Sequence, residues 1–197
     1  PQAEAALREA ISLGADEAIL DSDRAFAGAD TLATSYTLAM AIKKIKDYDL
    51  IICGKQAIDG DTAQVGPGIA AHLDIPQITY VRKIEALEEK SITAQRTTEE
   101  GYEVLQSPLP CLLTVVKEIN NPRIPSLKGK MKAKNAAILT WKAADIEAES
   151  DRLGIAGSPT EVWKIYTPPA RSKGQIYDGD PEGAVNAIVA VLKEHLI

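Results

Sequence analysis

The chain has 197 residues, of which 45% are hydrophobic and 25% charged, as is typical of a soluble globular protein of one domain with a sizeable core. Its 22 basic and 28 acidic side chains give a formal net charge of −6, and only 5% of its residues are aromatic. Both figures argue against nucleic-acid binding, which needs a positive surface and often aromatic rings that stack on bases. No apolar stretch approaches the length of a transmembrane helix, so we expect no membrane partner.

The N-terminal part of the chain alternates between helical and strand-like patterns. Apolar residues follow helical spacing over residues 2–13, and a short strand is expected over 17–20. A second helix is predicted over 30–46, with Asp30 as its N-cap. The apolar run 50–53 then predicts a buried strand. Helices and strands in this order are typical of a parallel, Rossmann-like sheet.

Residues 49–71, DLIICGKQAIDGDTAQVGPGIAA, combine a strand, a glycine-bearing loop and a helix start. Backbone N–H groups at a helix N-terminus lack intrahelical partners, and the helix dipole favours an anion there. A strand followed by a glycine-bearing loop and a helix start therefore predicts a phosphate site. Gly60 would let a ligand approach the backbone, and Asp61 or Thr62 would cap the helix. The loop is neither a Walker A sequence nor a GxGxxG. A purely structural strand-to-helix turn is the alternative.

Beyond Pro76 the pattern changes to short strands, expected over residues 77–85, 91–98, 102–106 and 111–116. Glu99-Glu100-Gly101 predicts a hairpin turn between the middle two. The connections are too short for helical crossovers, so these strands should be largely antiparallel, and the apolar run 109–116 should be central. The expected fold is therefore α/β: a Rossmann-like mixed sheet, with a parallel part plus antiparallel strands, flanked by helices.

Residues 120–135, NNPRIPSLKGKMKAKN, form a second unusual stretch, here called the basic segment. It carries five basic residues, Arg123, Lys128, Lys130, Lys132 and Lys134. Leu127 and Met131 are spaced by four, as on one face of a helical turn. The segment is either a solvated basic loop with these two residues tucked under it or an interaction loop, with apolar anchors ringed by positive charge, for an acidic partner.

The C-terminal part predicts a last strand over 136–143, a short helix over 145–153, and irregular chain over 155–180. The irregular chain is rich in proline, glycine and serine, yet it carries large side chains that require burial: Val162, Trp163, Ile165, Tyr166 and Tyr177. An arm that packs on another surface would explain this mixture.

The final helix is expected to begin with Asp180 as its cap and Pro181 at its first position. Its apolar stripe, Val185, Ile188, Val189 and Leu192, either closes the domain or docks on a partner. We therefore expect a nucleotide-binding domain over residues 1–154 and a C-terminal arm with its helix over 155–197.

The sequence contains no convincing catalytic set and no metal site. Asp59 and Asp61 are two apart, but their place in a phosphate loop favours solvated or capping roles. Cys53 and Cys111 lie in apolar runs without CxxC spacing, which predicts buried, reduced thiols and a reducing compartment. We expect the bacterial cytoplasm ahead of the mitochondrial matrix. His72 and His195 are far apart in the sequence, and no other pattern indicates a metal. We therefore predict no catalytic residue and no metal ligand. Any chemistry should belong to a cofactor.

AIDGDTAQVGP (residues 57–67) followed by the basic segment resembles the β subunit of electron-transfer flavoproteins. The first stretch matches the family's adenine-nucleotide loop and the second its partner-recognition loop, and the resemblance covers essentially the whole chain. Family members begin with a strand and a nucleotide turn, whereas this sequence begins at the helix that should follow them. We therefore expect that a segment preceding residue 1 completes the ligand site.

The resemblance implies a heterodimer with an electron-transfer flavoprotein α subunit, whose mobile domain carries an FAD, while the β subunit holds AMP or a second FAD. Ten residues would surround the phosphates and ribose: Asp59, Gly60, Asp61, Thr62, Ala63, Gln64, Val65, Gly66, Pro67 and Ala70. Leu127 would match the leucine that anchors an acyl-CoA dehydrogenase, with Met131 beside it and Lys132 as a flanking lysine. Asn135 departs from a lysine seen in some members. The arm after Ile155 would reach the α subunit.

The amino-acid sequence of the nucleotide loop also implies a branch of the family. Members that hold AMP resemble a DDDxNQTGQ pattern, whereas DGDTAQVGP looks like the branch with electron-bifurcating and nitrogen-fixation-associated proteins. There the β-subunit FAD takes a hydride from NADH, one electron goes to ferredoxin or flavodoxin, and the other goes through the α-subunit FAD to the dehydrogenase. The alternatives are a non-bifurcating electron carrier with structural AMP and, more remotely, a universal-stress-type nucleotide-binding module.

Overall fold

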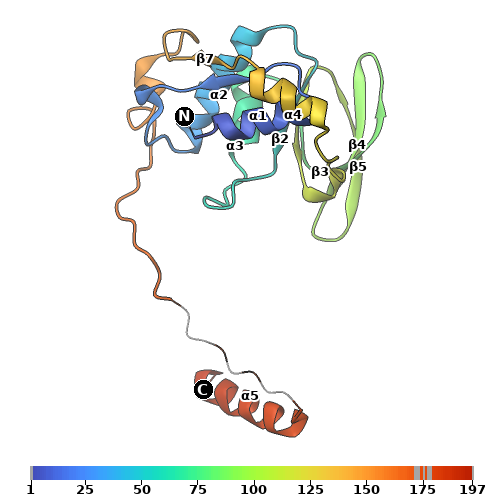
Figure 1. Ribbon diagram of the computed structural model, residues 1–197, viewed down its shortest axis with the longest axis vertical. Coiled ribbons are helices and arrows are strands. Elements are labelled where there is room, and N and C mark those ends of the chain that lie inside the picture. The colour runs from blue at the N-terminus through green and yellow to red at the C-terminus, as the bar shows by residue number, and fades with distance from the viewer. Residues whose placement is uncertain (1, 171–173, 175, 177–178, 197) are drawn as a thin grey trace. The chain divides into compact units, whose positions relative to one another are not determined.

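The computed structural model describes residues 2–170, 174, 176 and 179–196. The chain forms two compact units, residues 1–162 (unit 1) and residues 163–197 (unit 2). Among the described residues the strands belong to unit 1, as do all the α-helices but the last, whereas the last α-helix belongs to unit 2 (Figure 1). No helix among these described residues is long and apolar enough to cross a membrane.

The first half of unit 1 alternates helices and strands as predicted: α1 (Glu4–Leu13), β1 (Ile19–Asp21), the short 3-10 helix η1 (Arg24–Phe26), α2 (Thr31–Ile45), β2 (Leu50–Gly54) and α3 (Val65–Leu73). Asp30 is the N-cap of α2, because its Oδ1 accepts hydrogen bonds from the amides of Leu32 at 2.9 Å and Ala33 at 3.1 Å. The predicted capping of this helix is confirmed.

The main sheet has five strands in the order β2-β6-β3-β4-β5, formed also by β3 (Gln77–Leu87), β4 (Ser91–Thr97), β5 (Tyr102–Pro108) and β6 (Cys111–Val115). The pairs β2–β6 and β3–β6 are parallel, and β3–β4 and β4–β5 are antiparallel, so the predicted mixed sheet is confirmed. The central place of β6 is confirmed too. Its parallel pairing with β3 was not expected. It arises because only Leu109 and Pro110 separate β5 from β6, so the chain keeps its direction while it changes neighbours.

A second, two-stranded parallel sheet pairs β1 with β7 (Leu139–Trp141), which is shorter than the predicted last strand. Among the described residues β2 pairs with β6 alone, so one edge of β2 is open. The side chain of Ile52 is 57% exposed, because side chains alternate along a strand and Ile51 and Cys53 are the ones that pack on the cluster of α2 and α3. The prediction that this strand is buried is therefore wrong at Ile52, because an apolar run does not report whether both faces of a strand are covered.

Apolar side chains gather in two clusters that hold the main sheet and its helices together. One cluster lies on the sheet and consists of Ile78, Val81, Ile92, Ala94, Cys111 and Leu113. The other joins α2 and α3 to the sheet through Ala39, Ile69, Ala70 and Leu112. Burial raises the pKa of the Cys111 thiol, and also that of the half-buried Cys53. The helices α2 and α3 are thus packed against β2 and β6, and the 55–64 loop follows β2 directly.

The rest of unit 1 contains η2 (Lys117–Ile119), α4 (Leu127–Asn135) and η3 (Ser150–Arg152). The helix predicted over 145–153 is reduced to η3, because Glu147 has a positive φ of 53°, which ends any helical run. In unit 2, α5 (Pro181–Leu196) begins as predicted, with Asp180 Oδ1 accepting a hydrogen bond from the Gly183 amide at 2.9 Å.

No helix or strand lies between residues 155 and 180 among the described residues, which agrees with the expected irregular chain. The side chains of Val162, Trp163, Ile165 and Tyr166 are exposed. Tyr177, the remaining residue for which burial was predicted, lies outside the described residues.

Candidate functional site

The loop that follows β2 borders a cavity of about 580 Å³ in unit 1. This cavity lies at the carboxyl ends of the parallel strands β2 and β6, where ligands bind in open α/β sheets. Its walls come from the start of α2 (residues 29–34), from the loop, and from the start of α3. Two helix N-termini therefore meet at one cavity, and their dipoles favour an anion within it.

Most of the residues predicted to hold a nucleotide line this cavity: Asp59, Gly60, Thr62, Ala63, Gln64, Val65 and Gly66. The other three do not. Asp61 Oδ1 accepts a hydrogen bond from Gln56 Nε2 within the loop, Pro67 lies in the first turn of α3, and Ala70 is completely buried between α3 and the sheet. Asp59 and Asp61 form no carboxylate pair: Asp59 Oδ1 accepts from the Gly60 amide at 2.9 Å.

The start of α3 is free to receive an anion. Its N-cap is Gln64, which has helical backbone angles and provides no side-chain cap, so the predicted capping by Asp61 or Thr62 is wrong. The Gln64 Oε1 atom instead accepts a hydrogen bond from Thr31 Oγ1 of α2 at 2.7 Å. By helix geometry the amides of Val65 and Gly66 have no intrahelical acceptor, and these donors lie at the cavity.

The loop backbone is strained where it turns into α3. Asp61 and Ala63 have positive φ angles of 50° and 55°, which residues other than glycine rarely adopt and which cost of order 1–3 kcal/mol each. Gly60 does not have this conformation, and a Cβ at Gly60 would meet no atom of the described chain within 4 Å. The space next to Gly60 is therefore open to a ligand, as the sequence predicted.

Two glycines of α3 set the position of that helix. A Cβ at Gly66 would lie 2.5 Å from Thr114 Cγ2 of β6, and one at Gly68 would lie 2.6 Å from Ser35 Oγ of α2. Gly66 and Gly68 therefore let α3 approach the sheet and α2. Gly66 was predicted as a cofactor contact, but Gly68 was not identified, because only the packed structure reveals such close approaches.

Sequence reasoning also missed the contribution of α2 to the cavity, which includes Asp30, Thr31 and Thr34. Burial alone would raise the pKa of the Asp30 carboxyl, but hydrogen bonds from the Ala33 amide, Thr160 and the Leu32 amide outweigh it, and the pKa is lowered. The Asp30 amide also donates a hydrogen bond to Ser158 Oγ at 2.8 Å. The start of α2 is thereby tied to residues 158–160. An N-cap residue such as Asp30 predicts where a helix begins, but it does not predict which cavity the first turn of that helix borders.

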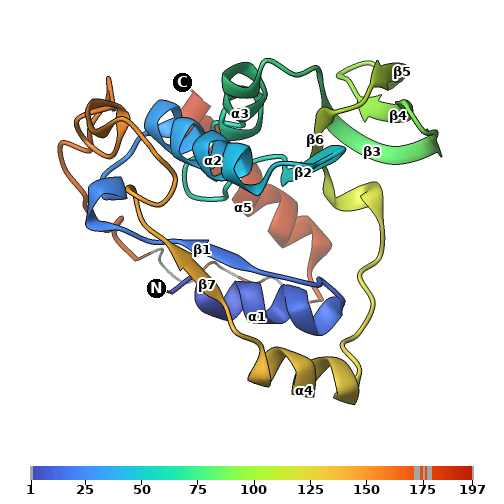
Figure 2. The same cartoon turned by 90° about the horizontal axis from the view of Figure 1, so that it is seen from above.

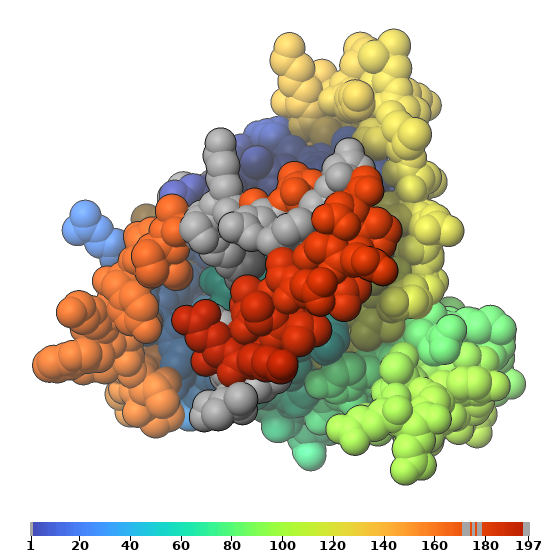
Figure 3. All heavy atoms as spheres, turned by 90° about the horizontal axis from the view of Figure 1, so that it is seen from below, coloured from blue at the N-terminus to red at the C-terminus, as the bar shows by residue number. Residues whose placement is uncertain are grey.

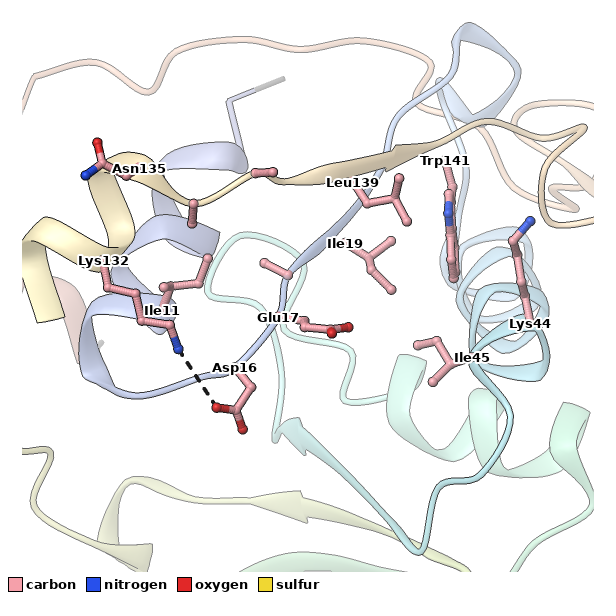
Figure 4. Close-up of a pocket in the computed structure, with 13 residues that line it drawn as sticks. Ile11, Asp16, Glu17, Ile19, Lys44, Ile45, Lys132, Asn135, Leu139 and Trp141 are labelled. Carbon is pink, nitrogen blue, oxygen red and sulfur yellow. Dashed lines mark ion pairs between the residues drawn. The ribbon is translucent and has the colours of Figure 1, made fainter.

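A larger cavity of about 740 Å³ lies elsewhere in unit 1 and is drawn in Figure 4. Its walls combine apolar side chains, such as those of Ile11, Ile45 and Trp141, with the charged side chains of Asp16, Glu17, Lys44 and Lys132. It adjoins the C-terminal end of α2, where the helix dipole disfavours an anion. The smaller cavity is therefore the better candidate for a phosphate-bearing ligand.

The basic segment contains α4, which lies against α1 on the side of unit 1 opposite α3 (Figure 2). The side chains of Leu127 and Met131 are 77% and 60% exposed, so the alternative in which they are tucked under a loop is wrong. Lys132 is exposed and reaches toward the chain that follows α1: its Nζ donates to the Ala15 carbonyl at 3.1 Å and lies 3.8 Å from Asp16 Oδ1.

Comparison with known proteins identifies the family. Residues 1–146 match the electron transfer flavoprotein domain. The chain is 50% identical to the electron transfer flavoprotein subunit beta of Megasphaera elsdenii, over 100% of this chain and 74% of that protein. It is 49% identical to the caffeyl-CoA reductase-Etf complex subunit CarD of Acetobacterium woodii, over 100% of this chain and 76% of that protein.

Protein FixA of Azotobacter vinelandii is 46% identical over 98% of this chain and 72% of its own length. A family match over most of the chain and three relatives near half identity agree with the mixed α/β fold and with both motifs found in the sequence. The chain therefore belongs to the electron transfer flavoprotein family and is similar along its whole length to the β subunits of that family.

Proposed function

We propose that this chain is the β subunit of a heterodimeric electron transfer flavoprotein that holds FAD and takes part in flavin-based electron bifurcation. Electrons would pass from NADH to ferredoxin or flavodoxin and, through the FAD of the α subunit, to an acyl-CoA dehydrogenase. The cavity at the start of α3, with two helix N-termini and uncapped amides, is the observation that carries the proposal.

The residues of this cavity fit the phosphate-bearing half of an adenine dinucleotide. Val65 and Gly66 offer amide donors, the Thr62 hydroxyl is a further possible donor, and Gly60 leaves open space for a ligand to approach the backbone. The hydrogen bond between Thr31 and Gln64 joins the starts of α2 and α3. The cavity is therefore fixed by the protein before any ligand enters it.

The role of this chain is to bind and orient the cofactor. When bound, FAD would supply hydride acceptance and single-electron transfer. The protein would hold its phosphates on the amides at α3 and exclude water from the cavity. This role requires neither a titrating side chain nor a nucleophile; the charged side chains that line the cavity are those of Asp30, Lys55 and Asp59.

Relatives of two kinds support the bifurcating branch over the plain carrier. One is named as a subunit of a caffeyl-CoA reductase-Etf complex, and others are named FixA. AMP would use the same amide donors, so a non-bifurcating β subunit with structural AMP is the second candidate. The family membership leaves no support for a universal-stress-type module. Because the described relatives are bacterial proteins, we place the heterodimer in the bacterial cytoplasm.

The proposal is tested by NADH oxidation in the full-length heterodimer. With ferredoxin and the dehydrogenase with its acyl-CoA substrate all present, we expect NADH oxidation with equal electron flow to each acceptor. Omission of either acceptor should stop most of the flow to the other. Flow to the dehydrogenase that is unaffected by omission of ferredoxin would contradict bifurcation and favour the plain carrier.

A further inference from the structure

The helix α4 is held along α1 by contacts at its base, and its outer side chains are left free. The C-cap of α4 is Ala136, which has an extended backbone, so the usual glycine cap is absent from this helix. Arg8 of α1 replaces it. Its Nη1 donates to the carbonyls of Ala133 at 2.7 Å and Ala136 at 3.2 Å.

Arg8 is itself held in place by Glu4 on the preceding turn of α1. Glu4 Oε1 accepts from Arg8 Nε at 3.0 Å and from Nη2 at 2.8 Å. The guanidinium thus uses one edge for Glu4 and one nitrogen for the end of α4. A planar group with several fixed donors suits this arrangement, and a lysine ammonium would reproduce only part of it.

The basic segment in turn covers the C-terminal end of α1. Arg123 Nε donates to the Leu13 carbonyl at 2.7 Å, and Lys132 Nζ donates to the Ala15 carbonyl at 3.1 Å. Arg8 of α1 therefore bonds carbonyls at the C-terminal end of α4, and two cations of the basic segment bond carbonyls at and just beyond the C-terminal end of α1, where positive charge is favourable.

Gly129 allows the two helices to lie this close. A Cβ at Gly129 would lie 2.3 Å from the carbonyl oxygen of Ser12, which is a backbone atom of α1 and cannot rotate away. Alanine at this position would therefore displace α4 from α1. It would not weaken the helix itself, because alanine favours helix formation more than glycine does.

The side chains that do not face α1 form a small apolar surface on the basic segment, which projects from unit 1 in Figure 3. Leu127, Met131 and Ile124 belong to this surface, and the side chain of Ile124 is 89% exposed. A surface that is already ordered before binding loses less conformational entropy on binding.

From these contacts we infer that α1 is the platform that fixes the pose of α4 for the electron-transfer partner, with Arg8 and Gly129 as positioning residues. This inference rests on the proposed function, in which α4 meets the dehydrogenase. Arg8 and Gly129 act through Leu127 and Met131, so their replacement should weaken the recognition of the partner without changing the cofactor site.

The test uses the full-length heterodimer with the variants Arg8→Met, Arg8→Lys and Gly129→Ala. For Arg8→Met and Gly129→Ala we expect the KM for the dehydrogenase to rise by about tenfold, which corresponds to about 1.4 kcal/mol. The kcat at saturating dehydrogenase, the flavin content and reduction of a small dye acceptor should remain within about twofold. Arg8→Lys should recover part of the loss, and Arg24→Met, at an exposed arginine of η1, is the matched control.

The Leu127→Ala variant separates the two possible failures. If Leu127→Ala raises KM but Arg8→Met and Gly129→Ala leave it unchanged, α1 is not the platform and only this inference is overturned. If Leu127→Ala has no effect either, α4 is not the partner surface, and both the inference and that part of the proposed function fail.

The double variant Arg8→Met/Leu127→Ala tests whether Arg8 acts through Leu127. We expect its KM to be little higher than that of Leu127→Ala alone, because the loss of the Arg8 contacts matters only when the Leu127 side chain is present to be misplaced. If the two effects are fully additive, Arg8 does not act through Leu127 and the inference is overturned.

Discussion

Gly60 is the position where a side chain would enter the nucleotide cavity with the least disturbance to the protein. A Cβ there meets no other atom of the described chain within 4 Å, and the φ angle of Gly60 is not positive. Loss of ligand affinity on substitution would therefore report a clash with the ligand and not a change in the fold.

We expect the series Gly60→Ala, Gly60→Val and Gly60→Leu to lower affinity for FAD progressively. The largest members should cost about 1–3 kcal/mol, or about 5- to 150-fold in Kd, because added methylene groups overfill the phosphate approach. The measurement is titration of FAD into the heterodimer after its cofactors have been removed, with thermal unfolding as the control. Equal affinity across the series would mean that the phosphates do not pass Gly60.

Gly66 and Gly68 have a different role from Gly60, because the position that a Cβ would occupy is filled by neighbouring protein atoms. The Gly66 and Gly68 positions would place a Cβ within 2.6 Å of Thr114 and Ser35, respectively. All three glycines lie in one short stretch of the chain, yet Gly60 borders open space whereas Gly66 and Gly68 face protein atoms. Sequence alone reveals a glycine-rich helix start, but only packing shows which glycine faces a neighbour and which faces the cavity.

At the scale of single elements, the helix α4 presents the apolar surface of the basic segment. Leu127 lies in its first turn, and its side chain is exposed with Met131 one turn later. Apolar side chains that are exposed in one subunit and surrounded by cations are typical of a contact with a partner of opposite charge.

We predict that Leu127→Ala slows electron transfer to the dehydrogenase while cofactor content stays unchanged. Loss of a central anchor costs more than about 1 kcal/mol, so the KM for the dehydrogenase should rise by at least about fivefold. Stopped-flow reduction of the dehydrogenase would measure the effect. Leu87→Ala, at a similarly exposed leucine at the end of β3, is the matched control. An unchanged transfer rate in the Leu127 variant would mean that the anchor assignment is wrong.

The elements that could be predicted from the sequence are those with strong local signals. Asp30 before an amphipathic run gave the start of α2, and Asp180 followed by Pro181 gave the start of α5. The apolar run of β6 indicated a central strand. Elements with weak local signals could not be predicted in the same way. The helix α4 has a sequence of lysines around a glycine, and Arg8, more than a hundred residues away, bonds its C-terminal end.

The candidate site was predicted only in part for the same reason. Seven of the ten nucleotide residues line the cavity, because they lie together on one continuous loop. Thr31 and Thr34 were missed because they approach the loop only through the packing of α2 on α3. Ala70 was assigned to the site but is buried in the core, since a helix carries successive residues to different faces.

At the scale of the whole molecule, the proposed cofactor cavity lies on one side of unit 1 and the proposed partner surface on the other. The cavity lies at α3, whereas the partner surface is on α4 beside α1 (Figure 2). The exposed apolar side chains of residues 162–166 and of α5 remain available to the α subunit. This division of surfaces is what an electron carrier needs, because the cofactor and the docking of the partner can then be changed separately.

The central claim is that the cavity at α3 holds FAD in the assembled heterodimer. The most direct measurement is the content of flavin and AMP per heterodimer, determined on the purified full-length protein after denaturation. We predict two FAD molecules and no AMP per heterodimer. One FAD with one AMP would contradict the claim and would show that this chain serves a plain electron carrier.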